Sequence, residues 1–71
     1  MKVSKYTVNG LENDNSAQNI KQSIRMYSGI HAIRVDKNSN TITIDYDDEQ
    51  YSNQDIENFV NLSGLTVKSA E

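Results

Sequence analysis

Hydrophobic residues in this 71-residue chain show two kinds of spacing: every second residue in some stretches, and every third or fourth residue in others. Polar and apolar residues alternate over four stretches, which predicts β-strands at 5–8, 30–35, 41–46 and 65–67. Apolar residues recur every three or four positions over two further stretches, which predicts helices over 17–27 and 53–62. No proline interrupts an element. The sequence therefore predicts the order β-α-β-β-α-β.

Turn and cap residues support these boundaries. The pairs Asn9-Gly10, Ser28-Gly29 and Ser63-Gly64 are expected to end the first strand and the two helices, because glycine tolerates the left-handed conformation found there. Ser52 and Asp55 resemble a capping box at the start of the second helix. Three residues are candidates for the cap of the first helix: Asp14, Asn15 and Ser16.

Right-handed crossovers fold this order of elements into a ferredoxin-like α+β sandwich, in which a four-stranded antiparallel sheet carries both helices on one face. We expect a single domain over residues 1–71, because a chain of this size forms one core. The predicted inward residues are Tyr6, Val8, Ala17, Ile20, Ile24, Tyr27, Ile33, Val35, Ile42, Ile44, Tyr46, Ile56, Phe59, Val60 and Leu62. The other face of the sheet is expected to be exposed to solvent. The residues that point outward on it are Lys5, Thr7, Thr41, Thr43 and Asp45.

Composition excludes several kinds of function. The chain has no cysteine, which removes disulfides, thiolate metal sites and cysteine redox chemistry. No apolar run approaches the roughly 18 residues of a membrane span, so we expect a cytoplasmic protein. The chain has seven basic and ten acidic residues, which gives a net charge of −3, and the basic residues form no cluster in the sequence. This balance argues against nucleic acid or an anionic membrane as a partner.

With its elements placed, the chain resembles the heavy-metal-associated domains of copper chaperones and metal-transporting ATPases. The resemblance spans residues 3–68 and consists of short segments at matching spacing. These segments are Val8-Asn9-Gly10-Leu11, Tyr27-Ser28-Gly29-Ile30, Ile33-Arg34-Val35-Asp36, Thr41-Ile42-Thr43-Ile44-Asp45-Tyr46 and Ser63-Gly64-Leu65. In that family the loop after the first strand carries Gly-Met-x-Cys-x-x-Cys, and its two thiolates bind Cu(I) or another soft ion.

Counted from Gly10 without a gap, the family's methionine position is Leu11 and its two cysteine positions are Asn13 and Ser16. Cu(I) selects sulfur ligands, whereas an amide and a hydroxyl are neutral oxygen donors. We therefore expect no bound metal at these degenerate ligand positions and no cofactor. Leu11 can fill the space of the methionine that packs inward in the family. A bacterial copper chaperone often has tyrosine where this chain has Leu65.

The polar loop is the best candidate for an interaction site. Its residues are Leu11, Glu12, Asn13, Asp14, Asn15 and Ser16, with Leu65 beside them. The alternative is that Asn13 and Ser16 only cap the helix. His31 is interpreted as a surface residue at the opposite end of the fold. Asp45, Asp47, Asp48 and Glu49 form an acidic connection at that same end, where Ca²⁺ or Mg²⁺ binding is the less favoured interpretation.

The sequence offers little for catalysis, so we expect a non-enzymatic domain. No Gly-rich phosphate loop follows a strand, and the loop after the first strand lacks the arginine of the acylphosphatases that share this topology. Tyr6, Tyr27, Tyr46, Tyr51 and Phe59 are interpreted as core or rim residues, which argues against stacking on RNA.

Three hypotheses follow. The leading one is a protein-interaction or regulatory module linked to metal homeostasis, with a partner such as a domain of a metal-transporting ATPase. The second is a copper chaperone-like protein that binds a copper ion through Met1, Met26, Asn13, Ser16 or ligands supplied by a partner. The third is a small-molecule-binding regulatory domain of the same topology. A monomer or a weak homodimer paired through a sheet edge is expected.

Overall fold

The structure, a computed structural model, describes residues 1–11 and 14–70, with the side chain of Asp14 left out. It confirms the predicted order β-α-β-β-α-β. The elements are β1 (Lys2–Asn9), α1 (Asp14–Arg25), β2 (Ile30–Asp36), β3 (Thr41–Tyr46), α2 (Asn53–Leu62) and β4 (Thr66–Ala70).

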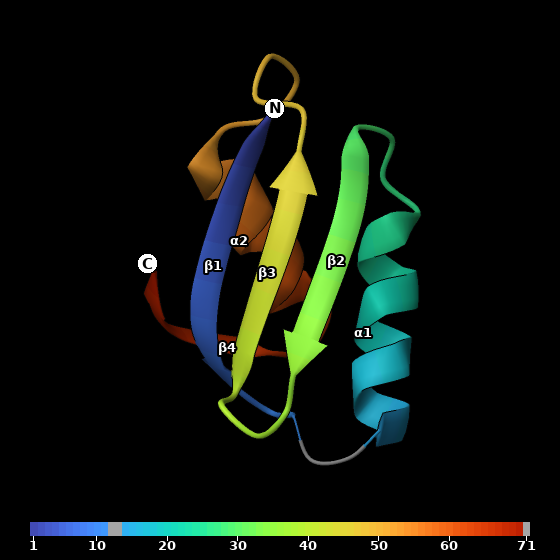
Figure 1. Cartoon of the computed structure of the whole chain (residues 1–71), viewed down its shortest axis with the longest axis vertical. Helices are drawn as coiled ribbons and strands as arrows, with labels where there is room; N and C mark the ends of the chain where they lie inside the picture. Colours follow the sequence, from blue (N-terminus) through green and yellow to red (C-terminus); the bar gives the residue numbers. More distant parts are fainter. Residues whose placement is uncertain (12–13, 71) are drawn as a thin grey trace.

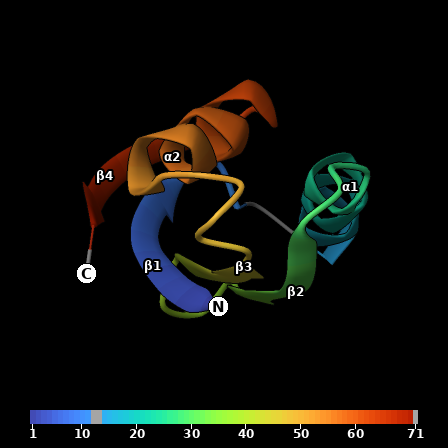
Figure 2. The ribbon, with the colours of Figure 1, turned by 90° about the horizontal axis from the view of Figure 1, so that it is seen from above.

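The four strands form one antiparallel sheet in the order β2-β3-β1-β4 (Figure 1). β1 therefore lies inside the sheet, between β3 and β4, with Tyr6 opposite Ile42 on one side and opposite Ala70 on the other. Both helices cover the same face of the sheet, α2 above β1 and β3 and α1 beside β2 (Figure 2). This arrangement confirms the predicted ferredoxin-like sandwich.

The core lies between the sheet and the helices and follows the predicted spacings. Its sheet side consists of alternate residues of β1 and β3, and its helix side consists of residues one turn apart on each helix. The buried side chains are Tyr6, Val8, Leu11, Ile20, Ile24, Ile42, Ile44, Tyr46, Ile56, Val60 and Leu65. Tyr27, Ile33, Val35, Tyr51 and Phe59 are half-buried, and the ring of Phe59 stacks on that of Tyr27 with centroids 4.1 Å apart.

Two predicted details of α1 are wrong. The helix begins at Asp14, so Asn15 and Ser16 lie in its first turn and cannot cap it. It ends at Arg25, which leaves Tyr27 outside the helix, although the Tyr27 ring still packs against Phe59. Apolar spacing alone could not locate the end of the helix, because Tyr27 lies on the inner side whether it belongs to the helix or to the turn that follows.

The start of α2 confirms the predicted capping box, while one predicted core residue is wrong. The Ser52 hydroxyl accepts the N–H of Asp55 at 3.2 Å, and the Asp55 carboxylate accepts the N–H of Ser52 at 2.9 Å. Leu62 is 76% exposed, so it does not join the inner face of the helix. Ile56 and Val60 fill that face instead, because they are one turn apart while Leu62 falls past the stripe.

The turn between β2 and β3 is held by the Asp36 carboxylate. One oxygen accepts the N–H of Asn38 at 3.0 Å and that of Ser39 at 3.3 Å. These hydrogen bonds, first the one from Asn38, lower the pKa of Asp36 below its ordinary value. Asp36 therefore stabilises the fold above the pKa that this group has in the unfolded chain, and the contribution is lost as the pH falls through the lowered folded-state pKa.

We expect Asp36→Asn to remove this part of the pH dependence, because the amide keeps an acceptor oxygen but carries no charge. The check is thermal melting of both proteins between neutral and acidic pH. The native protein should lose more melting temperature on acidification than Asp36→Asn does. Equal losses would show that the Asp36 turn does not contribute to the pH dependence of stability.

Among the described residues, no helix is long and apolar enough to cross a membrane.

Candidate functional site

The candidate loop connects the end of β1 to the start of α1, and its base rests on the core. Gly10 has a backbone φ of +111°, in the region that favours glycine. A Cβ atom at Gly10 would lie 3.1 Å from the Cδ2 atom of Leu65, which precedes β4. Leu11 is 8% exposed and Leu65 is 3% exposed. The first two loop residues therefore pack against the core, and Gly10 allows the close approach to Leu65.

Gly10→Ala is expected to destabilise the domain more than Gly64→Ala does. Both glycines have positive φ, so both substitutions strain the backbone by about 1 kcal/mol or more. Only the new methyl group at position 10 meets a neighbour, since nothing lies within 4 Å of a Cβ at Gly64. Urea denaturation of both variants measures the difference. Equal losses would mean that the packing of Gly10 against Leu65 carries no stability.

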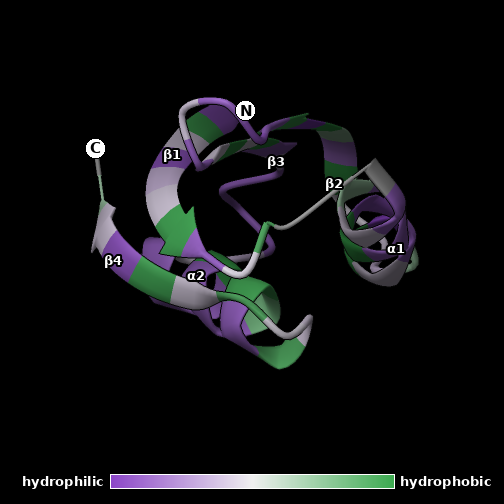
Figure 3. Cartoon of the chain, turned by 90° about the horizontal axis from the view of Figure 1, so that it is seen from below, coloured by the Kyte–Doolittle hydropathy of each residue, from purple (hydrophilic) through white to green (hydrophobic). Residues whose placement is uncertain are grey.

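A shallow hollow of about 230 Å³ lies beside the loop, between the first turns of α1 and the end of α2. It is lined by Gly10, Ser16, Asn19, Ile20, Ser63 and Gly64. Figure 3 views this end of the molecule, where the end of β1, the beginning of α1 and the segment between α2 and β4 come together. Of the two degenerate ligand positions, Ser16 is half-buried at this hollow and makes polar contact with the protein. Glu12 and Asn13 lie outside the described residues, and Asn15 is exposed.

The hollow beside the loop is lined by hydroxyl, amide and apolar side chains and by two glycines. No group of three or more His, Cys, Asp or Glu residues comes together within the described ranges, and the sequence has no cysteine. The hydroxyl of Ser16 is a hard, neutral donor that a soft ion does not select. The described side chains here are the buried Leu11 and Leu65, the half-buried Ser16 and the exposed Asn15.

The two methionines proposed as substitute ligands lie away from the loop. Met1 precedes β1 whereas the loop follows it, and the eight residues of β1 span roughly 26 Å. Met26 follows the C-terminal end of α1, whose N-terminal end adjoins the loop. Both side chains are exposed, Met1 by 78% and Met26 by 79%. The fold therefore does not bring them to Ser16.

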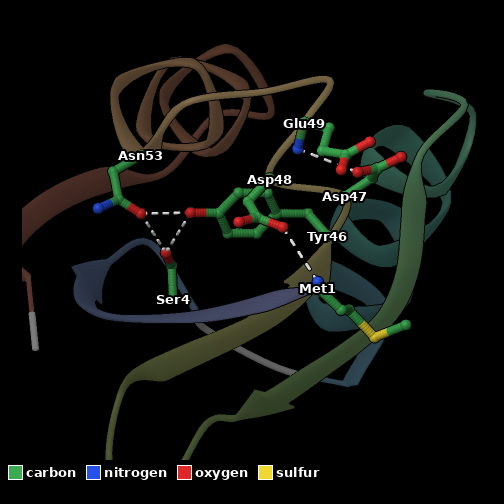
Figure 4. Close-up of polar contacts among 7 residues, drawn as sticks. All are labelled: Met1, Ser4, Tyr46, Asp47, Asp48, Glu49 and Asn53. Atoms are coloured by element: carbon green, nitrogen blue, oxygen red, sulfur yellow. Dashed lines mark hydrogen bonds and ion pairs between the residues drawn. The ribbon is translucent and has the colours of Figure 1, made fainter.

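At the opposite end of the molecule, no group of three or more His, Asp or Glu residues comes together within the part of the chain that the structure describes. The Asp48 carboxylate pairs with the N-terminal amine of Met1 at 3.0 Å, and the Asp47 carboxylate accepts the N–H of Glu49 at 3.0 Å (Figure 4). The Met1 amine holds the pKa of Asp48 below its ordinary value. Asp45 lies on β3, and His31 is exposed on β2. The carboxylates of Asp47 and Asp48 thus both have partners within the chain.

Sequence reasoning missed a partly buried polar cluster between β1, β3 and α2, in which Ser4, Tyr6 and Tyr46 are buried and Asn53 is exposed. The Ser4 hydroxyl donates to the Asn53 side-chain oxygen at 2.8 Å, and the Tyr46 hydroxyl donates to the same oxygen (Figure 4). The Tyr6 hydroxyl donates to the Asn53 backbone carbonyl at 3.2 Å, and burial raises the pKa of Tyr6. The signal in the sequence was the spacing of Ser4, Tyr6 and Val8, which places Ser4 on the inner face once the strand begins at Lys2.

The fold is shared with solved structures of copper-binding domains. The sequence matches no family model and no curated protein sequence. The structure matches a copper-binding domain from HMA7, a P-type ATPase, with a TM-score of 0.86 and 15% identity over 100% of this chain and 99% of that chain. It also matches a putative copper-ion-binding protein from Bacillus anthracis str. Ames (TM-score 0.82, 18% identity, 94% of each chain).

A third match is a chain in the Atx1-Cu(I)-Ccc2a complex, with a TM-score of 0.79 and 17% identity over 100% of this chain and 93% of that chain. At these identities the likeness is one of fold. The chain therefore has the ferredoxin-like fold of the heavy-metal-associated domains and contains no cysteine.

Proposed function

We propose that this protein is a non-enzymatic, cytoplasmic interaction module linked to metal homeostasis, and that it docks a protein partner through the loop of residues 10–16. The observation that carries the proposal is the contrast within this loop. Its buried base is well packed, with Gly10 close to Leu65 and with Leu11 inside the core. The positions that correspond to thiolate ligands in the related family are Asn13 and Ser16.

The loop thus keeps the packing of its first residues against the core but lacks the thiolate ligands. Leu11 and Leu65 each lose solvent contact on folding, and burying a leucine contributes about 2 kcal/mol, so Leu11 is held firmly in the core. A hydroxyl and an amide do not hold Cu(I) at an exposed site. We infer that the loop serves recognition, because its first residues pack against the core while Asn15 is exposed to solvent.

Solved structures of the same fold supply the analogy for the kind of partner. Atx1 and Ccc2a are present together with Cu(I) in one complex, and HMA7 is a P-type ATPase whose copper-binding domain has this fold. By analogy, we propose a metal-binding domain of a metal-transporting ATPase as the partner of this chain. Such an encounter would be a transient one with a small interface.

Chemical-shift mapping tests the proposal. Labelled protein is titrated with the soluble metal-binding domain of a copper-transporting ATPase, with and without Cu(I). The expected shifts gather at residues 10–16 and at the neighbouring Ser63, Gly64 and Leu65. Absence of shifts, or shifts confined to the opposite end around His31, would contradict docking by the loop.

A pair of charge variants sharpens the mapping. Glu12→Lys changes the charge of the loop, and Glu49→Lys makes the same change at the opposite end of the molecule. Glu12→Lys should alter the affinity for the ATPase domain about severalfold, because surface charges govern encounter between small domains. Glu49→Lys should leave the affinity unchanged. An equal effect of both variants would point to a general charge effect and against the loop.

A further inference from the structure

Among the residues that the structure describes, the first half of β1 pairs with a strand on only one side. β1 pairs with β3 from Lys2 to Thr7, whereas its pairing with β4 runs only from Tyr6, opposite Ala70, to Asn9. Figure 1 shows this upper half of β1 with no strand on the side away from β3. In an antiparallel sheet, alternate residues direct their N–H and C=O groups to each side. The stretch Lys2–Ser4, which we term the open edge, therefore presents backbone groups that a further strand can pair with.

A groove of about 330 Å³ runs between the open edge and the first turns of α2. Its lining includes Lys2, Ser4, Gln54, Glu57 and Ala70. Lys2 and Glu57 carry opposite charges in this groove, yet no ion pair joins these two described residues; the Glu57 carboxylate instead accepts the Gln54 amide at 3.3 Å. On the outer face of the same edge, Val3 is 62% exposed. The open edge thus combines unpaired strand backbone, an exposed apolar side chain and two opposite charges.

We propose that the open edge pairs antiparallel with the open edge of a second copy of this chain, so that the two four-stranded sheets join across a two-fold axis at Val3. This inference does not depend on the proposed function. Residues directly opposite each other in an antiparallel pair lie on the same face of the sheet. Only registers that keep inward residues opposite inward residues are therefore allowed.

Among these registers, one fits the open edge. Placing Lys2 opposite Lys2 would bring like charges together. Placing Ser4 opposite Ser4 would set Lys2 against Tyr6, whose side of the strand is already taken by Ala70. Placing Val3 opposite Val3 sets Lys2 of each copy against Ser4 of the other. The exposed valines then cover each other on the outer face.

In this register each copy completes the groove of the other. Lys2 of one copy projects on the inward face beside Ser4 of the other, into the groove that Glu57 lines. Two symmetric ion pairs between Lys2 and Glu57 result. Lysines on an edge strand often block pairing, but here the groove supplies a carboxylate of opposite sign. The interface involves few residues, so the dimer is weak. The C-terminal ends of the two β1 strands lie at its two far ends.

Sedimentation velocity across a concentration series measures the association of the full chain. We expect a reversible monomer–dimer equilibrium, weakened by added salt because surface ion pairs are screened. Amide shifts that change with concentration should map to Lys2–Ser4 and to the turn of α2 that carries Glu57. A monomer at about 1 mM, or a dimer whose shifts map to the edge of β2, would overturn the proposal.

Charge-reversal variants of Lys2 and Glu57 test whether a second copy of this chain pairs with the open edge. Lys2→Glu alone and Glu57→Lys alone should each raise the dimer dissociation constant about tenfold, because two attractions become two repulsions. An equimolar mixture of the two variants should dimerise again. In the mixed dimer the new carboxylate of one chain faces the new ammonium group of the other, and the native Lys2 and Glu57 that remain face each other.

A matched control carries the same charge change outside the groove. Lys68→Glu should leave dimerisation intact, because Lys68 does not line the groove. A mixture of Lys2→Glu and Glu57→Lys that stays monomeric, or an equal loss of dimer in Lys68→Glu, would overturn the register.

Discussion

The double variant Asn13→Cys/Ser16→Cys is expected to bind one Cu(I) several orders of magnitude more tightly than the native protein does. The two thiolates would occupy the positions that the family's motif assigns to its ligands, counted from Gly10. Thiolates are the donors that Cu(I) selects, whereas the native amide and hydroxyl are not. The buried base of Leu11 and Leu65 is already in place, so the substitutions change donors on an existing scaffold.

A matched control places the same spacing elsewhere. Ser28 and His31 are also three residues apart, but they lie at the opposite end of the molecule, across a turn and the start of β2. Competition with a chromophoric Cu(I) chelator compares the two double variants. Asn13→Cys/Ser16→Cys should remove Cu(I) from the chelator at much lower protein concentration than Ser28→Cys/His31→Cys. Equal affinities would mean that the likeness to metal-binding domains stops at topology.

Ile44→Ala is expected to leave the domain only marginally stable at room temperature, with a substantial unfolded fraction. Ile44 is fully buried at the centre of β3, and truncating such a side chain costs about 2–5 kcal/mol through lost burial and the cavity that remains. A cysteine-free domain of this size has only about 3–5 kcal/mol of stability in total. One substitution therefore removes most of the free energy of unfolding.

Urea denaturation followed by circular dichroism measures this loss. Met26→Ala is the control, because Met26 is 79% exposed and its truncation should change stability by less than about 0.5 kcal/mol. If Ile44→Ala retained the stability of the native protein to within about 1 kcal/mol, the placement of Ile44 in the core would be wrong.

The fold was predictable because most of the chain shows one spacing at a time. The strict alternation in β3 predicted Ile42, Ile44 and Tyr46 on the inner face, and all three are buried. Element ends were less predictable. Leu62 was assigned to the core because it is apolar and helical, but spacing does not reveal that α2 turns it outward.

Long-range contacts were the other limit. Ser4 and Asn53 are 49 residues apart, and no pattern in the sequence pairs them before the register of β1 and the start of α2 are known. The candidate loop was found by its register to a known motif, since no local spacing distinguishes Asn13 and Ser16 from ordinary polar residues. Their roles therefore depend on the likeness of fold and on experiment.

Cu(I) binding by the native protein decides whether the loop has lost its metal chemistry. The reduced protein is titrated into Cu(I) held by a competing chromophoric chelator, and the chelator absorbance reports transfer. We predict that the chelator keeps its Cu(I), because the loop offers an amide and a hydroxyl in place of two thiolates. Stoichiometric transfer of Cu(I) to the protein, with an affinity in the range of thiolate chaperones, would contradict a loop that serves recognition without metal.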